Sequence, residues 1–367
     1  MKKILFISHT GSLAGAENVL IEVIKVVSLN SNNQIFVVCP SDNSTAFEEE
    51  IKKVKIQQFN RLPYRVLRNT FSLMFRNLLF SCLSFFPLIY LCKKNKIDII
   101  YSNTSVNIIG VIVAFLLKKK HIWHIHEQST SYHRWTPACL DIFYKKAFLR
   151  KDNFSLFVSY ATKEAWEKQI KHPIDNCFVL YSKFNKLHPS PIKERKIFTF
   201  GFLGGLTNNK NVNMLIDSFS EIPNANLIIG GTGEKYVELQ KYILQISQNN
   251  RIQFVGKVTD IIQFYASIDV LVQPSLNESW GLVALEAISA GKCVIMTNKT
   301  GLVEILSSKE CIFFDPTSKE QLLAAMRLVI SDPTYRQLLA TNATNTLNKL
   351  NLNQHFDINI LQILKNA

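Results

Sequence analysis

Short apolar runs alternate along this chain with longer stretches of helical periodicity. The first run, at 3–8, is followed by a loop that contains Gly11 and Gly15 and then by a helical pattern that continues to about Leu29. Such runs are typical of strands buried on both faces, and their alternation with helices predicts a parallel sheet covered by helices. Further strands predicted in this half of the chain lie at 34–39, 97–102, 121–126 and 154–159.

The same alternation restarts after a polar, proline-containing stretch at 185–196. A second domain also fits the length, because 367 residues exceed the usual size of one domain. We therefore predict an α/β protein of two Rossmann-like, doubly wound domains, at 1–188 and 189–349, that face each other across a ligand cleft. The segment 350–367 is predicted as a final helix and is a candidate to pack back on the N-terminal domain. The strands predicted in the second domain lie at 197–203, 226–230, 251–255, 269–273 and 293–296.

The strongest chemical signal is the segment ESWGLVALE at 278–286, which follows a predicted strand. Glu278 precedes a helix predicted to begin near Gly281, and Glu286 lies about two turns inside that helix. Free amides at a helix N-terminus bind anions, and carboxylates accept hydrogen bonds from sugar hydroxyls, so the pattern favours a ligand with phosphate and hydroxyl groups. The spacing alone also fits a capping role for Glu278 and a surface ion pair with lysine for Glu286. The amides that would face the anion belong to Ser279, Trp280, Gly281 and Leu282.

Further segments form an ordered series with this motif. They are SLAGAEN at 12–18, DIIYSN at 98–103, WHIHE at 123–127, FLGGLTNNKN at 202–211 and GGTG at 230–233. In this order, and across nearly the whole chain, they resemble the retaining, nucleotide-sugar-dependent glycosyltransferases of family 4, group 1, which have the GT-B fold. Each segment alone is a weak signal, whereas their common order makes the resemblance specific.

The resemblance implies a reaction and a set of site residues. The reaction would be transfer of a hexose, with retention, from a nucleoside diphosphate sugar to a lipid-linked or surface-polysaccharide glycan, without a metal or another cofactor. His126 would lie beside the donor sugar, Glu278 would hold the sugar hydroxyls, and Lys210 would neutralise the diphosphate. Glu286 would bind the ribose, and Gly15 would let the backbone approach the phosphates or the acceptor closely. The other donor-binding residues implied are Gly204, Ser279, Trp280, Gly281 and Leu282.

Gly205 stands where the family pattern has an arginine. Departure of the nucleoside diphosphate develops negative charge, which cations and helix amides stabilise. The missing guanidinium leaves a second interpretation open, a catalytically weak GT-B protein that binds nucleotide or glycan. Smaller departures are Cys293 in place of a proline, and Ser182 with Lys183 in place of Asn-Gly.

Histidines near the end of a predicted strand suggest a different class of enzyme. His124 and His126 share one face of the strand at 121–126, as in some metal-dependent hydrolases. That interpretation requires more His or Asp ligands at later strand ends, and no such pattern follows, so no metal is expected. The glycines at 11 and 15 lack the Gly-x-Gly-x-x-Gly spacing of a dinucleotide site, which argues against an oxidoreductase.

Positive charge is concentrated in one part of the chain. The net charge is +14, and residues 51–150 hold 17 Lys and Arg against three Asp and Glu, whereas 201–367 have a net charge of −1. The excess therefore lies outside the predicted donor domain and indicates a membrane or acceptor surface. No nucleic-acid-binding module accompanies the charge, so nucleic acid is not expected as a partner.

A helix predicted to open near Pro63 would gather four arginines in one arc, opposite an apolar face. Basic amphipathic helices bind anionic membrane surfaces, although an ordinary domain helix with a solvated arginine side has the same pattern. The arginines are Arg61, Arg65, Arg68 and Arg76, and the apolar residues are Leu67, Phe71, Met74 and Leu78.

The sequence offers no strong targeting signal. The apolar run at 4–7 is shorter than the core of a signal peptide. The uncharged runs at 77–92 and 99–117 contain a proline and a series of polar residues, respectively, which do not fit a spanning helix. Seven scattered cysteines without a CxxC pair are typical of reduced cytosolic thiols. We therefore predict a cytoplasmic protein that binds peripherally at the inner face of the cell membrane.

Overall fold

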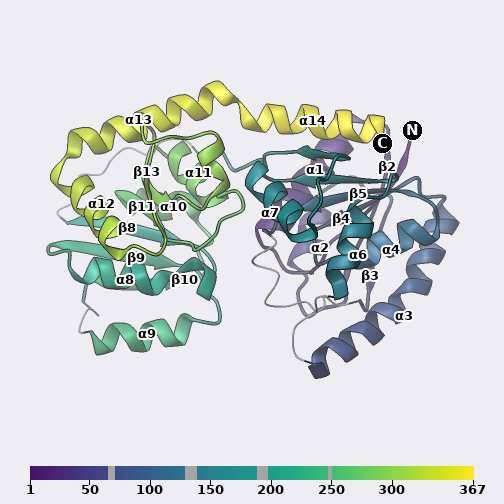
Figure 1. Ribbon diagram of the computed structural model, residues 1–367, viewed down its shortest axis with the longest axis horizontal. Helices are drawn as coiled ribbons and strands as arrows, with labels where there is room; N and C mark the ends of the chain where they lie inside the picture. The colour runs from purple at the N-terminus through teal and green to yellow at the C-terminus, as the bar shows by residue number, and fades with distance from the viewer. Residues whose placement is uncertain (65–70, 129–138, 188–196, 247–249) are drawn as a thin grey trace. The chain divides into compact units, whose positions relative to one another are not determined.

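The structure is a computed structural model that describes residues 1–64, 71–128, 139–187, 197–246 and 250–367, with the side chains at 71–82 and 139–140 left out of the description. The chain divides into two compact units (Figure 1). The first unit comprises Met1–Lys183 and Leu352–Ala367, and the second unit comprises Phe184–Asn351. This division lies a few residues before the predicted boundary at 188, and it assigns the C-terminal helix to the first unit.

Within the described residues, the first unit has one sheet of seven parallel strands in the order β3-β2-β1-β4-β5-β6-β7. Central β1 pairs with β2 on one side and with β4 on the other. Because the strands are parallel, their carboxyl ends meet at one edge of the sheet. The strands are β1 (Lys3–Ile7), β2 (Gln34–Pro40), β3 (Gln58–Leu62), β4 (Ile99–Asn103), β5 (Lys120–Ile125), β6 (Asn153–Phe157) and β7 (Cys177–Val179).

Two apolar clusters hold the helices of the first unit against this sheet. One cluster joins Leu5 and Ile100 of the sheet to Leu88 of α3 and Val113 of α4. The other joins β5 to α6 and α7, and in it Trp123 stacks on Phe148 with ring centroids 5.0 Å apart. The helices are α1 (Gly15–Asn30), α2 (Ala46–Ile51), α3 (Phe71–Asn95), α4 (Ile108–Leu116), α6 (Cys139–Phe148), α7 (Tyr160–Ile170) and α14 (Leu352–Asn366).

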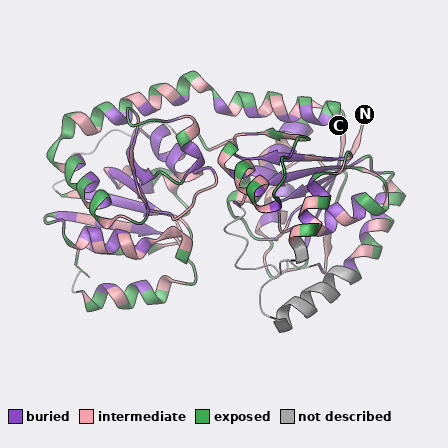
Figure 2. Cartoon of the chain, in the orientation of Figure 1, coloured by how far each residue is buried: buried purple, intermediate pink, exposed green. Residues whose placement is uncertain are grey.

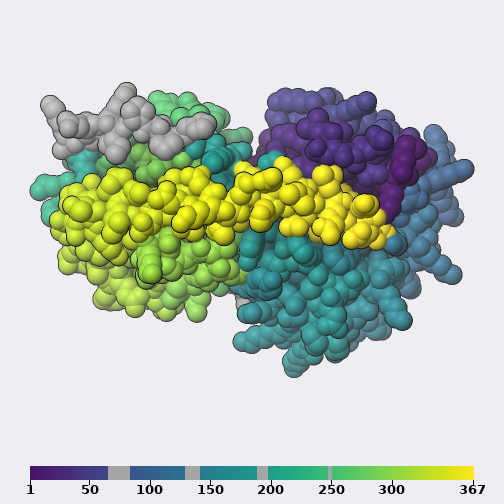
Figure 3. Space-filling view, turned by 90° about the horizontal axis from the view of Figure 1, so that it is seen from above, coloured from purple at the N-terminus to yellow at the C-terminus, as the bar shows by residue number. Residues whose placement is uncertain are grey.

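Helix α14 lies against α1 on the surface of the first unit, beside the N-terminal segment (Figure 3). Lys2 Nζ donates to the carbonyls of Leu364 and Lys365 over 3.2 and 2.8 Å. Lys183 Nζ lies 3.2 Å from Asp357 of α14 and 3.5 Å from Glu22 of α1. Lysines at both ends of the helix therefore tie it to this unit.

Within the described residues, the second unit has a sheet of six parallel strands in the order β10-β9-β8-β11-β12-β13. Its core gathers Phe200 and Phe202 of the sheet with Phe219 of α8 and Leu322 of α12, all fully buried. The strands are β8 (Phe198–Leu203), β9 (Ala225–Gly230), β10 (Ile252–Gly256), β11 (Val270–Gln273), β12 (Cys293–Thr297) and β13 (Ile312–Phe314). The helices are α8 (Val212–Ser220), α9 (Tyr236–Gln245), α10 (Ile261–Ala266), α11 (Leu282–Ser289), α12 (Lys319–Ser331) and α13 (Pro333–Leu350), with short 3₁₀ turns at Asn208–Lys210 and Gly301–Glu304.

The predicted pair of doubly wound α/β domains is confirmed, with buried strands and exposed outer helix faces in each unit (Figure 2). The sequence pattern does not predict β3, β7 or β13. Each of these strands lies at or next to the edge of its sheet, where one face is less buried and no continuous apolar run is needed. Across the described residues, no helix combines the length and the apolar character needed to cross a bilayer.

The placement predicted for Arg61 is wrong. Arg61 lies in β3, not on a helix, and β3 pairs in register with β2. Its guanidinium donates to the carbonyl oxygens of Asp42 and Ser44 over 2.5 and 2.9 Å and lies 3.6 Å from Glu48 Oε2. In turn, Asp42 Oδ2 accepts from the Gly11 amide over 2.7 Å. Arg61 is therefore a structural residue that fixes the loop after β2, rather than part of a membrane-binding arc.

Candidate functional site

In the second unit, loops that follow β8 and β9 meet at the carboxyl edge of the sheet. The Gly204 amide donates to the Gly230 carbonyl over 3.0 Å. A Cβ at Gly231 would lie 1.8 Å from the Gly204 carbonyl oxygen, and the φ angle of Gly231 is +128°. Glycine is required at 231 for this approach of the two backbones, which explains the GGTG segment.

Gly205 lies next in the same loop, but in open space. A Cβ there would meet nothing closer than atoms of Thr207 and Thr232 at 4.0 Å. A longer side chain therefore fits at this position, and crowding does not explain the absence of the arginine found in the family pattern.

Lys210 and Glu278 come together at this edge. Lys210 Nζ lies 2.5 Å from Glu278 Oε2, and the two side chains are 24% and 20% exposed. Their loops are joined as well, because Leu276 N donates to Asn209 O over 2.8 Å and Asn209 Nδ2 donates to Asn277 O over 2.8 Å. Both side chains are partly exposed to solvent, so an anionic ligand can reach Lys210 and replace Glu278 as its partner.

Helix α11 begins beside this ion pair. Its N-cap is Gly281, which has a φ angle of +110° and no side chain with which to cap the first turn. A Cβ at Gly281 would lie 2.9 Å from Leu302, so glycine is required here as well. Glu278 is held next to the helix start, because its amide donates to Lys299 O over 2.8 Å and its carbonyl accepts from Gly301 N over 3.0 Å. Of the other predicted residues at this start, Trp280 is buried, and Ser279 and Leu282 are partly exposed.

Glu286 lies inside α11, and its partners in the described part of the chain are Tyr265 and Asn185. The Tyr265 hydroxyl lies 3.3 Å from Glu286 Oε2 and 3.0 Å from Val283 O, and Asn185 Nδ2 donates to Glu286 Oε1 over 3.3 Å. Burial raises the pKa of Glu286 to about 7, although the hydrogen bonds from Tyr265 and Asn185 lower it. The carboxyl group therefore changes charge near neutral pH and is not engaged in a surface ion pair with lysine.

In the first unit, α1 begins at the carboxyl edge of the sheet, after the loop that follows β1. Its N-cap is Ala14, which cannot cap the helix with a side chain, and Gly15 is its first residue. Glu17 in the first turn is fully buried, and its Oε1 lies 2.7 Å from His9 Nδ1 and accepts from Ser8 Oγ over 3.3 Å. Burial opposes protonation of His9, but the hydrogen bond and charge of Glu17 outweigh it and raise the His9 pKa.

His126 directly follows β5 at this edge. Its Nε2 lies 2.9 Å from Asn103 Oδ1 at the end of β4, and its ring centroid lies 4.1 Å from that of His124. Burial lowers the pKa of His126 well below its usual value, and the positive charge that His124 and His9 can carry lowers it further. The His126 ring is therefore neutral near pH 7.

The histidine pair does not form a metal site within the described residues. His124 Nδ1 lies 2.7 Å from the Tyr101 hydroxyl inside the sheet, and burial lowers the pKa of His124 to about 3. Over the described ranges, no three His, Cys, Asp or Glu side chains gather in a way that could hold a metal ion. The described residues thus supply no ligand set for the hydrolase interpretation.

The predicted residues fall into separate groups. Gly15 and His126 belong to the first unit, and the donor-binding set around α11 belongs to the second unit. Arg65 and Arg68 lie outside the described residues, and the side chain of Arg76 in α3 is not described.

The sequence analysis did not identify several residues that contact the predicted site residues or their neighbours. His9 and Asn103 directly follow predicted strands. Because ligands bind at the carboxyl ends of parallel strands, this position could have identified both as candidate site residues. Tyr265 and Asn185 lie 21 and 101 residues from Glu286 along the chain, so no local spacing pointed to them.

Comparisons with known proteins match both halves of the chain to sequence families. Residues 14–182 match the family described as Glycosyltransferase Family 4, and residues 183–346 match the family described as Glycosyl transferases group 1. An uncharacterized glycosyltransferase of Haemophilus influenzae is 23% identical over 344 residues, which cover 91% of this chain and 92% of the relative.

A capsular polysaccharide biosynthesis glycosyltransferase of Staphylococcus aureus is 28% identical over 152 residues, 40% of each chain. Other curated relatives are also matched over only about two-fifths of their length, 38% and 39% in two cases. Among solved structures, the HepE protein of Anabaena in complex with UDP and glucose is similar over 100% of both chains, with a TM-score of 0.82 and 21% identity. At this identity the structural likeness concerns the fold, and that fold is the predicted GT-B fold.

The environment of Glu286 makes a prediction about its titration. In protein labelled with carbon-13 at the glutamate carboxyl groups, Glu286 should titrate near pH 7. Tyr265→Phe should raise this midpoint by about one unit, because it removes a hydrogen bond that favours the ionised form. Tyr242→Phe, which removes a hydroxyl that bonds Asp217 instead, serves as the control and should leave the Glu286 midpoint unchanged. A wild-type midpoint in the ordinary glutamate range would contradict this picture of the site.

Proposed function

This chain belongs to the group 1 glycosyltransferases of family 4, and we propose that it transfers a hexose, with retention of configuration, from a nucleoside diphosphate sugar to a glycan acceptor. One arrangement carries the proposal: at the carboxyl edge of the second sheet, the ion pair of Lys210 and Glu278 lies beside the start of α11, and Glu286 lies inside that helix. Lysine and amide donors match phosphate oxygens, and carboxylates match the hydroxyls of a ribose and a sugar.

In the proposed complex, each part of the donor has its own partner. Lys210 and the amides at the start of α11 bind the diphosphate, Glu278 accepts hydrogen bonds from the sugar, and Glu286 accepts them from the ribose. UDP-glucose is the first donor to test, since the Anabaena neighbour was solved with UDP and glucose. The acceptor, a lipid-linked glycan or a surface polysaccharide, is proposed by analogy with the capsular relative.

The reaction needs stabilisation of the leaving group more than it needs a base. The bond from the anomeric carbon to the β-phosphate oxygen breaks, and a bond to the acceptor oxygen forms on the same face of the sugar. The proton of the acceptor hydroxyl passes to the departing phosphate. Lys210 and the amides of α11 stabilise the charge on that phosphate, and we propose that they do so without a metal. His126 of the first unit would lie beside the sugar.

We also propose that the enzyme acts at the inner face of the cell membrane, through exposed side chains of α3 and α4. On α3, Leu83, Phe86 and Tyr90 are exposed and are spaced as one helix face. Phe115 and Leu116 are exposed at the end of α4, which packs against α3. These five side chains form what we call the apolar surface of the first unit.

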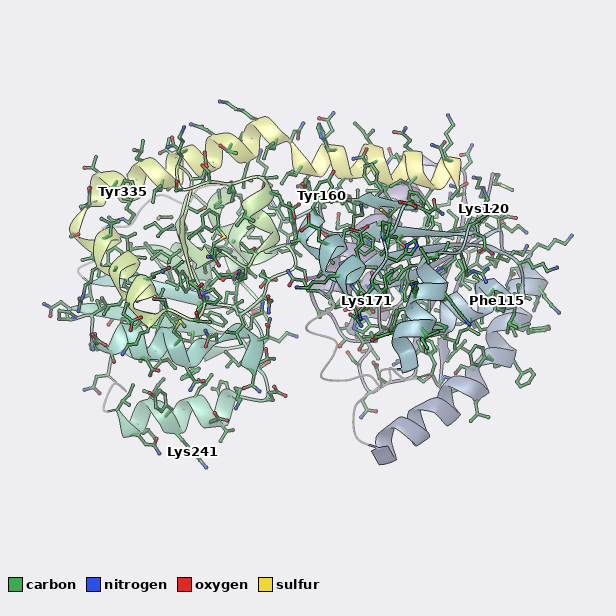
Figure 4. The ribbon with its side chains drawn as sticks, in the orientation of Figure 1. Phe115, Lys120, Tyr160, Lys171, Lys241 and Tyr335 are labelled. Carbon is green, nitrogen blue, oxygen red and sulfur yellow. The ribbon has the colours of Figure 1, made fainter. Side chains whose placement is uncertain are left out.

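Lysines adjoin the apolar surface. They come from the last turn of α3, the loop between α3 and β4, and the segment that leads into β5. Strands β4 and β5 are neighbours, with Ile99 opposite Lys120. Phe115 and Lys120 both lie at the outer edge of the first unit (Figure 4). Exposed aromatic and leucine side chains beside cations fit the interface of an anionic bilayer. The exposed lysines are Lys93, Lys94, Lys96, Lys118 and Lys120.

Donor affinity should depend on the charge of Glu286. Ribose hydroxyls donate hydrogen bonds, so binding favours the ionised carboxylate. In the protein without ligand, the pKa of Glu286 is about 7. The affinity for the donor should therefore be highest above pH 7 and should fall about tenfold between pH 8 and pH 6. Calorimetry with UDP-glucose tests this, because each of its two phosphates carries a single, strongly acidic proton and does not titrate in this range.

Two variants separate Glu286 from other titrating groups. Glu286→Gln should bind UDP-glucose more weakly at pH 8 and should show a flat pH profile. Glu320→Gln changes an exposed carboxylate in α12 and should behave as the wild type does. A wild-type profile that persists in Glu286→Gln would remove Glu286 from the donor site.

Gly205→Arg should raise donor affinity. The position is open, and a guanidinium there would add a second cation beside Lys210, which already shares its charge with Glu278. We expect UDP-glucose to bind about fivefold more tightly, as for one added charge-assisted hydrogen bond. Gly205→Ala controls for the loss of glycine and should bind as the wild type does. Equal affinity in both variants would show that the diphosphate does not lie near this loop.

The apolar surface should govern vesicle binding. In sedimentation with vesicles of phosphatidylglycerol and phosphatidylcholine, Phe86→Ser combined with Phe115→Ser should reduce bound protein about tenfold, since two exposed aromatic rings are lost. Added salt should weaken wild-type binding. Tyr160→Ser removes an exposed aromatic ring from α7 and should have no effect. Undiminished binding by the double variant would contradict the membrane assignment.

A further inference from the structure

The amide of Asn103 is held in one orientation. Its Nδ2 lies 3.1 Å from the Ala16 carbonyl oxygen and 3.3 Å from Glu17 Oε1. Both of these oxygens accept hydrogen bonds, so a flipped amide would set its own oxygen against two acceptors. The nitrogen therefore faces α1, and Asn103 Oδ1 faces His126.

This orientation decides which nitrogen of His126 carries the proton. Asn103 Oδ1 can only accept, so the His126 Nε2 that lies 2.9 Å away must be the donor. A neutral imidazole has one N–H, and His126 is neutral because burial lowers its pKa well below the usual value. His126 Nδ1 is then left with a lone pair, as an acceptor.

Glu17 stabilises this orientation of the Asn103 amide. It is fully buried, and the same Oε1 that meets Asn103 also lies 2.7 Å from His9 Nδ1 and 3.3 Å from Ser8 Oγ. Two neighbours from the loop after β1 and one from the end of β4 thus fix the carboxylate, and the carboxylate in turn holds the Asn103 amide. The network joins the start of α1 to the carboxyl ends of β1, β4 and β5.

We propose that Asn103 is a positioning residue that sets His126 in the Nε2–H tautomer, so that His126 Nδ1 accepts a hydrogen bond from a hydroxyl of the donor sugar. The choice of ligand rests on the proposed function, whereas the tautomer does not. Histidine in this state discriminates among ligands, because it binds a hydroxyl and rejects a group that can only accept.

The tautomer can be read without any substrate. In histidine-labelled protein at pH 7.5, nitrogen-15 spectra should show His126 with its proton on Nε2, assigned by the loss of the signal in His126→Gln. Asn103→Ser removes the acceptor and should shift His126 to a mixture of tautomers. Asn153→Ser is the matched control, because Asn153 Oδ1 meets His121 Nδ1 over 2.6 Å in the same unit, so only His121 signals should change. A wild-type Nδ1–H tautomer, or an unchanged His126 in Asn103→Ser, would overturn the proposal.

A pair of substitutions at His126 tests which nitrogen serves the reaction and also covers the case in which Asn103→Ser does not fold. The amide of Asn reaches the place of Nδ1, and that of Gln reaches the place of Nε2. His126→Asn should therefore keep about tenfold more kcat than His126→Gln, as for one hydrogen bond retained, at equal thermal stability. The opposite order would overturn the role of Nδ1. Absence of turnover in the wild type would instead refute the proposed function, while the spectra would still decide the tautomer.

Discussion

Parallel pairing of the strands is the constraint on which both candidate sites depend. In each sheet the central strand has parallel neighbours on both sides, so the segments that leave the strands all emerge at the carboxyl edge. Lys210 and Glu278 lie 68 residues apart in the chain, yet they follow neighbouring strands and form an ion pair. His126 and Asn103 meet for the same reason at the ends of β5 and β4.

Close backbone approach then shapes these edges into a binding surface. Gly231 allows one loop to pass over another, and Gly281 allows α11 to begin where a side chain would collide with Leu302. Affinity for a phosphate at such a surface comes from a few oriented donors, because residues 201–367 carry a net charge of only −1. We propose a separate role for the excess of positive charge in the first half of the chain, and we assign part of it to the lysines beside the apolar surface.

The sequence predicted the two α/β domains and the cluster around α11, because continuous apolar runs and an ordered series of motifs are local features. It did not predict the short strands near the sheet edges, whose residues are half-exposed and lack such runs. Arg61 was misplaced because helical periodicity was extended through β3, where the arginine instead bonds the loop after β2. The partners of Glu286 and the orientation of Asn103 depend on contacts between distant segments, which no spacing in the sequence encodes.

The central claim is that a nucleoside diphosphate binds at the carboxyl edge of the second unit, around Lys210 and the start of α11. Amide hydrogen exchange of the full chain, with and without UDP, tests it most directly. UDP should slow exchange in the loop after β8, at 204–210, and at the start of α11, at 279–283. Unchanged exchange in both segments at saturating UDP, or slowing confined to other parts of the chain, would contradict the account.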